Sequence, residues 1–470
     1  MVSFRFEEDL SRDVGGDVVG GGAGEAQQGK KQRVAEAVPA GLPRLFRRAR
    51  IVYHIGRYMK RTHYLGTALV AGIAALAAGS SILQKMAAAE ATGIKAPRFE
   101  VDPMWPKPLP NHWVIGAVIG VTADSNDHIW IIHREGSLEA KEQYATMKPP
   151  AAECCAAAPP VLEFNEAGDL IGSWGGPGQG FDWPSSNHGI DVDFKGNVWI
   201  GGNGAGAQAA PLPGDESRMG ATRSVHDSMV LKFTQQGKFL MQIGKPNQSK
   251  GSNDVENLRL PAKTLVDPKT NELYVADGYG NRRVIVYDAE TGKYKRHWGA
   301  YGHKPDDTQL PPYNPNDPPA QQFRTPVHCV TLANDGLLYV CDRVNDRIQV
   351  FKTDGTYVKE VFVAKNTMGD GAAFDLALSK DPEQKFLYLA DGSNMKIHVI
   401  DRQSLQVLTT FGDGGRQPGQ FYAVHSIATD SKGNVFTTET YRGQRVQKFL
   451  YKGLAAVTKK DQGVVWPKGK

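Results

Sequence analysis

The chain has 470 residues, of which 40% are hydrophobic and 22% charged, with 52 glycines and 28 prolines. This composition indicates a globular, turn-rich protein of one large or two ordinary domains, and it excludes a wholly disordered chain. Over residues 92–470, Lys plus Arg and Asp plus Glu both number 42, so the charge balance argues against nucleic acid or an anionic membrane surface as a partner.

Residues 59–91 have the features of an export signal. The basic stretch that begins at Met59 precedes the apolar run YLGTALVAGIAALAAG and the small residues KMAAAEATG, the order found in secretory signal peptides. A single membrane anchor is the alternative, but the run is shorter than the roughly 20 residues of a spanning helix. We expect cleavage near Ala91, a periplasmic or extracellular protein, and no stable membrane span after processing. Residues 1–58 are expected to be an upstream extension that is disordered or not translated.

Six related units follow the signal. Three begin with histidine: HGIDVDFKGNVWIGGN (188–203), HCVTLANDGLLYVCDR (328–343) and HSIATDSKGNVFTTET (425–440). Three lack it: IGVTADSNDHIWIIHR (119–134), AKTLVDPKTNELYVADG (262–278) and FDLALSKDPEQKFLYLAD (374–391). Apolar alternation on both sides of a Gly, Asn or Asp turn predicts an antiparallel hairpin in each unit.

Further alternating stretches, such as RIQVFKTDGTYVKEVFV, follow the units. Four short strands per unit, repeated six times, predict an all-β fold, a six-bladed β-propeller over residues 92–456 with a C-terminal tail over 457–470. The last unit has little sequence left for a fourth strand. We therefore expect residues 97–103 (PRFEVDP) to fill that place, because an open ring would leave two strand edges unpaired.

Closure of the ring places equivalent residues around one axis. The start of the innermost strand holds a histidine in blades two, four and six: His188, His328 and His425. The same position in blades one, three and five holds Ile119, Ala262 and Phe374. Histidines on alternate blades of a six-fold ring lie about 120° apart, so their imidazoles can converge on the axis. Three imidazoles with an open fourth position suit catalytic zinc, although copper, iron and manganese also accept such ligands. The alternative is three unrelated histidines, each bonded to a backbone carbonyl.

The repeats resemble NHL repeats, and most of residues 115–450 resembles the peptidyl-α-hydroxyglycine α-amidating lyase family (peptidylamidoglycolate lyase). That family is a six-bladed propeller whose axial zinc is held by three histidines, and it cleaves peptidyl-α-hydroxyglycine into a peptide amide and glyoxylate. The resemblance implies zinc ligation by His188 in NHGIDVD, His328 in PVHCVTL and His425 in AVHSIAT.

The resemblance also implies three catalytic residues. The family's tyrosine in an Asp-Gly-Tyr turn falls on Tyr279 in ADGYGNRR, and its two arginines fall on Arg134 in IIHREG and Arg343 in CDRVNDRIQVF. A tyrosine has an unperturbed pKa near 10, so Tyr279 would act as a base only if a cation lowers that pKa. The arginines could do so and could also pair with a substrate carboxylate. The alternatives are a packing tyrosine and solvated or Asp-paired arginines.

Several family positions differ in this chain: Gly280 and Tyr339 stand where two cysteines are expected, Ala423 replaces a methionine, and Ser426 replaces an acidic ligand of a structural calcium. The resemblance still admits calcium held by backbone carbonyls near Val121 and Ile190. The family's oxidative domain has no counterpart in the sequence, which would make a separate oxidative enzyme a partner.

Four cysteines and several long inserts complete the sequence features. Counting from the NDG turn places Cys329 opposite Cys341 on adjacent strands, where a disulfide is conceivable in an exported protein. The neighbours Cys154 and Cys155 could form a vicinal disulfide, bind a metal or stay as thiols. Residues 135–160 and 204–228 are long inserts at the end of the propeller where the histidines begin, and we expect them to wall a substrate pocket.

Two classes of function follow. The sequence favours a metal-dependent carbon–nitrogen lyase whose substrate is a small molecule or peptide with a carboxylate, either a peptidyl-α-hydroxyglycine or a related carbinolamide. A metal that binds the hydroxyl oxygen makes its proton more acidic, and a base removes it as the C–N bond breaks. The alternatives are a non-catalytic NHL propeller that binds a protein or polysaccharide, and a metal-dependent lactonase-like hydrolase. Fold alone does not separate them.

Overall fold

The computed structural model describes residues 93–205 and 226–467. All of them belong to one unit of the chain, Ser81–Lys470. The upstream extension and the export signal expected over residues 1–91 lie outside the described residues, and so does most of the insert at 204–228.

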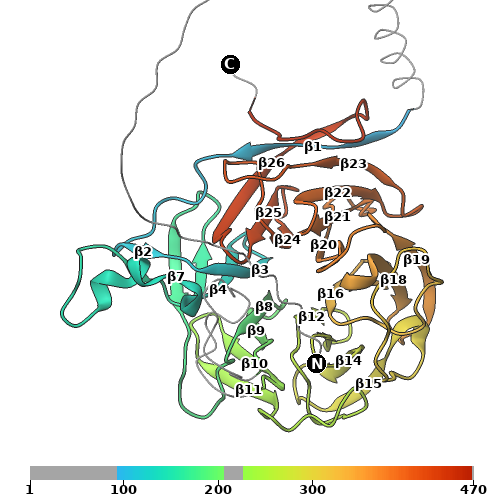
Figure 1. The fold of residues 1–470 in the computed structure, drawn as a ribbon, viewed down its shortest axis with the longest axis horizontal. Helices are drawn as coiled ribbons and strands as arrows, with labels where there is room; N and C mark the ends of the chain where they lie inside the picture. The colour runs from blue at the N-terminus through green and yellow to red at the C-terminus, as the bar shows by residue number, and fades with distance from the viewer. Residues whose placement is uncertain (1–92, 206–225, 468–470) are drawn as a thin grey trace, which may run out of the picture. The chain divides into compact units, whose positions relative to one another are not determined.

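Six four-stranded antiparallel sheets are arranged around a central axis (Figure 1). Blade one consists of β3 (Ala117–Ala123), β4 (Ile129–Arg134), β6 (Val161–Phe164) and β7 (Leu170–Trp174). Blade two consists of β8 (Asn187–Val192), β9 (Asn197–Gly202), β10 (Met229–Thr234) and β11 (Phe239–Gly244). Blade three consists of β12 (Lys263–Asp267), β13 (Glu272–Asp277), β14 (Arg283–Asp288) and β15 (Tyr294–Trp298).

Blade four consists of β16 (Val327–Leu332), β17 (Leu337–Asp342), β18 (Arg347–Lys352) and β19 (Tyr357–Phe362). Blade five consists of β20 (Asp375–Leu378), β21 (Phe386–Asp391), β22 (Lys396–Asp401) and β23 (Val407–Phe411). Blade six consists of β24 (Val424–Thr429), β25 (Val435–Glu439), β26 (Arg445–Ala456) and β1 (Lys95–Asp102). The predicted six-bladed propeller is confirmed.

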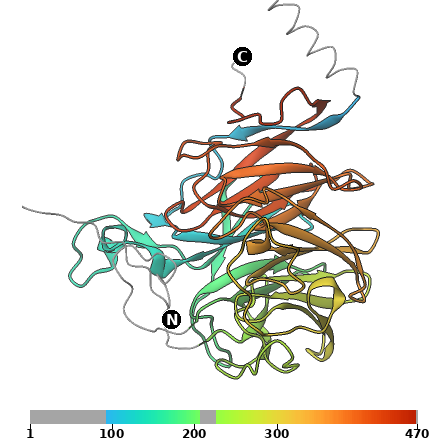
Figure 2. The same ribbon diagram turned by 45° about the vertical axis from the view of Figure 1, so that its right-hand side comes forward.

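The ring is closed by the strand that comes first in the sequence. β1 pairs antiparallel with β26 from Lys95 opposite Ala456 to Asp102 opposite Lys448, and Figures 1 and 2 show the two strands side by side. This confirms the predicted role of the PRFEVDP segment. We call the β1–β26 pairing the seam of the ring. The chain after β26 returns to β1, where the N–H of Val101 donates to the carbonyl of Val465 at 2.8 Å.

Apolar residues fill the space between neighbouring blades. The described residues contain six buried hydrophobic clusters, and each lies between two blades that are adjacent in the ring. At the seam, Phe99 of β1 packs against Tyr388, Phe411 and Tyr451. The alternation in each strand therefore serves two interfaces, because its two faces pack against different neighbouring blades.

In four blades, an acid that ends the second strand pairs with a basic residue of the third. These latch pairs are Asp277–Arg283 at 2.8 Å, Asp342–Arg347 at 2.7 Å, Asp391–His398 at 2.9 Å and Glu439–Arg445 at 2.7 Å. Each latch pair holds the connection between the second and third strands of its blade in one conformation. Two of these connections carry Tyr279 and Arg343, so the latch pairs fix the backbone from which candidate site residues project.

The first insert folds back beside blade one. It contains the 3-10 helices η1 (Glu135–Ser137) and η2 (Ala140–Thr146) and the strand β5 (Ala156–Ala157), which pairs parallel with β2 (Trp113–Val114). Two further 3-10 turns, η4 (Ala300–Gly302) and η5 (Arg343–Asn345), lie in blades three and four. Disulfides join Cys154 to Cys155 and Cys329 to Cys341.

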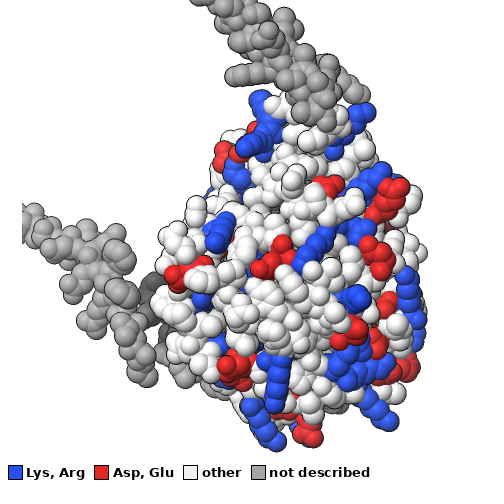
Figure 3. Space-filling view, turned by 90° about the vertical axis from the view of Figure 1, so that its right-hand side faces the viewer, with Lys and Arg blue, Asp and Glu red and all other residues white. Residues whose placement is uncertain are grey.

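Charged side chains of both signs are interspersed on the face of the propeller shown in Figure 3. Within the described residues, no helix is long and apolar enough to cross a membrane.

Candidate metal centre

Each of the three histidines is the second residue of the innermost strand of its blade. His188 lies in β8, His328 in β16 and His425 in β24. In each of these strands the ladder to its neighbour shifts register at or directly after the histidine. The equivalent strand of blade one, β3, shifts register at Ile119, whereas β12 and β20 pair without a shift. A β-bulge changes the direction in which a side chain points. The three imidazoles thus project from irregular positions of their strands, near the end of the innermost ladder.

The three imidazoles meet at one point. Their ring centroids are 5.1 Å apart for His188 and His328, 4.9 Å for His188 and His425, and 4.8 Å for His328 and His425. All three are buried, and one nitrogen of each lies within 4.8 Å of the others. A tetrahedral zinc with Zn–N bonds of about 2.0–2.1 Å needs nitrogens about 3.4 Å apart. Small rotations of the rings would therefore form the site.

Backbone carbonyls determine which nitrogen of the imidazole carries the proton in two of the three histidines. Nδ1 of His188 lies 2.8 Å from the carbonyl of Ala262, and Nδ1 of His328 lies 2.6 Å from that of Phe374. A carbonyl only accepts, so each Nδ1 carries the proton and each Nε2 keeps its lone pair. Ala262 and Phe374 occupy in blades three and five the position that histidine occupies in blades two, four and six. The sequence did not predict that their carbonyls orient the histidines.

His425 reaches the third of these carbonyls through a hydroxyl. Its Nδ1 lies 3.2 Å from Oγ of Ser426, and that hydroxyl donates to the carbonyl of Ile119 at 3.0 Å. Ser426, which replaces the family's acidic residue, thus gives His425 the same tautomer as the other two histidines. The Nε2 lone pairs of all three rings are left to face the axis, as they do in metal sites whose ligands are oriented by their surroundings.

Burial keeps the imidazoles neutral. It lowers the pKa of His188 to about 3, with the charge of Arg134 as the next cause. Burial also lowers the pKa values of His328 and His425 well below the usual range, and the neighbouring imidazoles and arginines add to the effect. The neutral form is the one that binds a metal ion.

Tyr279 lies on the same axis. Its hydroxyl is 3.0 Å from Nε2 of His188 and 2.9 Å from Nε2 of His328. A phenol has a single O–H, so it can satisfy only one of the two acceptors at a time. Two imidazole lone pairs thus share one donor, and the third imidazole lies beside them. Three neutral imidazoles are an electron-rich cluster suited to a cation, and this donor set fits zinc.

Two glycines on either side hold Tyr279 in place. A Cβ at Gly278 would collide with the backbone of Val327, and a Cβ at Gly280 would collide with Arg259. The tight Asp-Gly-Tyr-Gly turn is therefore required by close backbone approach. It also explains why glycine stands at position 280, where the resemblance led us to expect cysteine.

Arg343 joins the site from η5. One guanidinium nitrogen donates to the Tyr279 hydroxyl at 3.2 Å, another lies 3.3 Å from the Asp370 carboxylate, and the group lies 4.7 Å from the ring centroid of Phe374. Its Nε is buried and has no partner. Tyr441 also donates to Asp370, at 3.2 Å. Sequence patterns did not predict Asp370, because it lies in a loop outside the repeats. Tyr441 was also missed, although it follows Glu439 by two residues, as Tyr279 follows Asp277.

Arg134 lies at the end of β4 on the other side of the histidines. Its Nε donates to the carbonyl of Asn187 at 3.2 Å, and its terminal nitrogen donates to Oδ1 of Asn203 at 2.8 Å. Burial raises the pKa of Tyr279, and the positive charges of Arg343 and Arg134 oppose that rise. Without a further cation, the phenol is therefore protonated at neutral pH.

The first insert borders this end of the axis. A cavity between it and the loop after β25 is lined by Ser137, Glu139, Tyr441 and Gln444, among others, and Gln444 contacts the carbonyl of Ser137 at 3.5 Å. The insert thus forms part of the wall around Tyr441, which in turn contacts the carboxylate next to Arg343.

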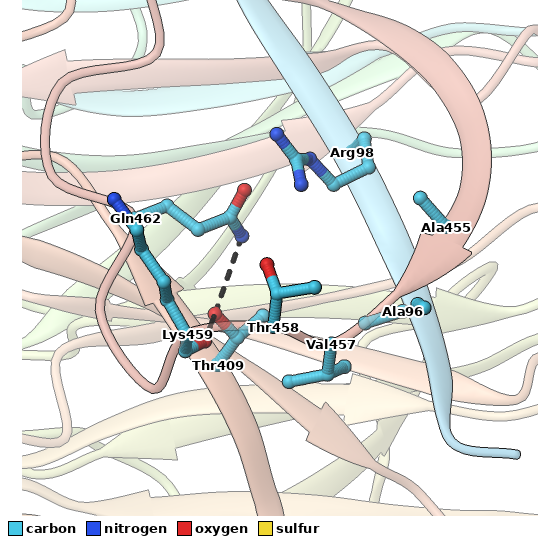
Figure 4. A pocket seen from close by; sticks show the side chains of 9 residues that line it. Ala96, Arg98, Thr409, Ala455, Val457, Thr458, Lys459 and Gln462 are labelled. Atoms are coloured by element: carbon cyan, nitrogen blue, oxygen red, sulfur yellow. Dashed lines mark hydrogen bonds between the residues drawn. The ribbon is translucent and has the colours of Figure 1, made fainter. Parts of the chain in front are cut away.

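Two other candidate sites lie elsewhere. Asp124, His128 and Glu163 cluster in blade one, but Asp124 already accepts from the indole of Trp130 at 3.1 Å and His128 bonds Glu163 at 2.8 Å. A pocket on the outer side of blade six, between β1 and the C-terminal segment, presents Arg98 (Figure 4). Neither adjoins the axis.

The place where the resemblance admits calcium lies beyond the histidines. Val121 and Ile190 line a cavity that also contains Lys263 and Asp375. The ammonium of Lys263 lies 2.5 Å from the Asp375 carboxylate. A cationic side chain at this place does not fit a second, divalent cation beside it.

Comparisons with known proteins agree with the repeat type. No family model matches the chain. The peptidyl-glycine alpha-amidating monooxygenase of Mus musculus is 25% identical over 255 residues, which cover 52% of this chain and 22% of that protein. Monooxygenase B of Xenopus laevis is 24% identical over 264 residues, covering 54% of this chain and 25% of its own length. The alignments thus span about a quarter of these relatives or less.

NHL repeat-containing protein 3 of Mus musculus is 24% identical over 263 residues, covering 55% of this chain and 58% of that protein. Among solved structures, a streptogramin B lyase aligns with a TM-score of 0.43 and 13% identity, covering 76% of this chain and 98% of the other. The chain is a six-bladed propeller, and it is similar to an NHL repeat-containing protein and to peptidyl-glycine alpha-amidating monooxygenases.

Proposed function

We propose that this protein is an exported, zinc-dependent lyase that cleaves the C–N bond of peptidyl-α-hydroxyglycine or a related carbinolamide and releases an amide and glyoxylate. The observation that carries the proposal is the convergence of three neutral imidazoles on one axial point, with the Tyr279 hydroxyl at 3.0 and 2.9 Å from two of them. The likeness to amidating monooxygenases supports the choice of reaction.

The metal would be held by Nε2 of His188, His328 and His425, and when bound it would supply positive charge for a developing oxyanion. Tyr279 is placed to accept the hydroxyl proton of the substrate. As that proton leaves, the C–O bond becomes a carbonyl, the C–N bond breaks, and the nitrogen departs with the bonding electron pair. The proton taken up by Tyr279 then passes to this nitrogen, which gives the amide and restores the base. No oxidant or reductant is needed for this step.

The arginines would bind the carboxylate that becomes part of glyoxylate. Arg343 has a buried Nε without a partner and an exchangeable contact to Asp370, whose side chain is 51% exposed. Arg343 also donates to the Tyr279 hydroxyl, and such a bond favours the phenolate over the phenol. One guanidinium can therefore orient the substrate and assist the base.

The decisive experiment combines metal analysis with glyoxylate detection. Purified protein should contain about one zinc per chain, the number that a single three-histidine site holds, and should release glyoxylate from a peptidyl-α-hydroxyglycine until a chelator removes the metal. His328→Ala should lose both metal and activity, whereas His303→Ala, which changes an exposed histidine, should keep both. Metal-loaded protein that releases no glyoxylate from a panel of such substrates would refute the lyase.

A non-catalytic NHL propeller is the second candidate. The alignment to NHL repeat-containing protein 3 covers 58% of that protein, a larger share than for the monooxygenases. Under this reading the histidines form a structural metal site, and chelation lowers stability without any activity to lose. The export part of the proposal is tested separately, by N-terminal sequencing of the protein recovered outside the cytoplasm, which should begin near residue 92.

A further inference from the structure

The axial cavity beyond the histidines contains an ion pair that the metal site does not explain. Lys263 of β12 and Asp375 of β20 belong to blades three and five, and blade four lies between them. The ammonium lies 2.5 Å from one carboxylate oxygen. The pair therefore spans the cavity from one innermost strand to another, and the side chains are 19% and 3% exposed.

Asp375 also ties in the strand of the third histidine. Its second carboxylate oxygen accepts the N–H of Ile427, at 3.1 Å, two residues after His425 in β24. A further carboxylate, the partly buried Asp191 of β8, has its pKa raised by desolvation, and the positive charge of Lys263 opposes that rise. The positive charge of Lys263 therefore acts on carboxylates of two different blades.

The position of the pair in the sequence links it to the histidines. Lys263 directly follows Ala262, and Asp375 directly follows Phe374; the carbonyls of Ala262 and Phe374 accept the Nδ1–H of His188 and His328. Pulling the two side chains together fixes both peptide units relative to each other. Any loosening of the pair would allow these carbonyls, and hence the rings, to shift.

We propose that the Lys263 ammonium takes the place of a structural metal ion in the axial cavity. Its ion pair with Asp375 positions the carbonyls that orient His188 and His328, two of the three zinc-binding histidines. Lys263 and Asp375 are positioning residues and touch neither metal nor substrate. The calcium that the family resemblance admits at Val121 and Ile190 is replaced by an ammonium built into the chain.

The first test needs no variant. Elemental analysis of protein purified in calcium-containing buffer should find zinc without stoichiometric calcium, and added calcium should leave the melting temperature unchanged. A protein that retains one calcium per chain, and that melts at a higher temperature when calcium is added, would overturn the proposal.

The second test measures zinc affinity by competition with a chromogenic chelator. Lys263→Met should weaken zinc binding by about 10–100-fold, the effect typical of groups that orient metal ligands, while Lys263→Arg should restore most of it. Lys195→Met is the matched control, since Lys195 pairs with Glu290 on the surface. Equal zinc affinity in Lys263→Met and Lys195→Met would refute the positioning role.

Neither measurement involves a substrate. The inference rests on the proposed metal centre, but absence of lyase activity would leave calcium content and zinc affinity unaffected. If Lys263→Met does not fold, the calcium analysis of the unmodified protein still decides between an ammonium and a metal ion.

Discussion

At the scale of single residues, the hydroxyl of Tyr279 is the most constrained group of the centre. It faces two imidazole lone pairs and one guanidinium, and it lies in a turn that needs glycine on both sides. A side chain that only packs would need no such set of polar partners. This placement leads to the first prediction.

Tyr279→Phe should reduce kcat by about 10²–10⁴-fold, the range for loss of a general base, while zinc content stays unchanged because the three histidines remain. Glyoxylate release and elemental analysis measure the two effects. Tyr294→Phe, at a tyrosine that is 40% exposed on blade three, is the control and should retain full activity. A Tyr279→Phe enzyme with unchanged kcat would exclude the phenol as the base.

Asp370 leads to a second prediction. Its carboxylate occupies the guanidinium that we assign to the substrate carboxylate, so Asp370→Asn should lower KM. An exposed ion pair is worth up to about 1 kcal/mol, which corresponds to a decrease of up to about five-fold. Asp335→Asn, which breaks the comparable pair with Arg402, should leave KM unchanged. An increase in KM for Asp370→Asn would show that Asp370 helps to bind the substrate.

The sequence predicted the meeting of three histidines because a repeat in register fixes angular positions around an axis. It did not predict Asp370, because a residue in a loop has no fixed position in the strand register of the repeats. It also did not predict the carbonyls that orient the rings, because every residue has a carbonyl and only the coordinates show which one faces an imidazole. The predicted placement of Cys329 opposite Cys341 is confirmed, since a hairpin turn fixes cross-strand neighbours. Whether the two form a disulfide was left open by the sequence, and the structure joins them.

At the scale of elements, the latch pairs connect strand geometry to site geometry. Asp277 and Arg283 are fully buried, and they brace the turn that carries Tyr279. Removing one partner of a buried ion pair costs about 3–5 kcal/mol, because the other charge is left uncompensated. Asp277→Ala should therefore lower the free energy of unfolding by that amount.

Urea unfolding followed by tryptophan fluorescence measures this loss. Glu290→Ala breaks a surface pair with Lys195 and should cost less than about 1 kcal/mol. Equal stability losses in the two variants would show that the latch pair is not a stabilising element. The bulges at the histidines belong to the same scale and could not be predicted, since apolar alternation continues through them without an interruption in the sequence.

At the scale of the whole molecule, stability depends on the seam between β1 and β26. Phe99 is 3% exposed, and its ring contacts aromatic rings of β21, β23 and β26. Phe99→Ala should lower the free energy of unfolding by about 3–5 kcal/mol, the cost of removing a buried aromatic ring. Leu454→Ala, at a residue of β26 that is 49% exposed, should have little effect. Similar losses in both variants would show that the seam does not hold the ring.

The seam joins the earliest described strand to one of the last, so the order of synthesis matters for this ring. Lys95 finds its partner Ala456 only after nearly the entire polypeptide has left the ribosome, and contacts this distant in sequence form late and slowly. A prematurely terminated product that stops before blade six lacks His425 as well as the seam. Chains of this kind are therefore both unclosed and unable to assemble the three-imidazole cluster.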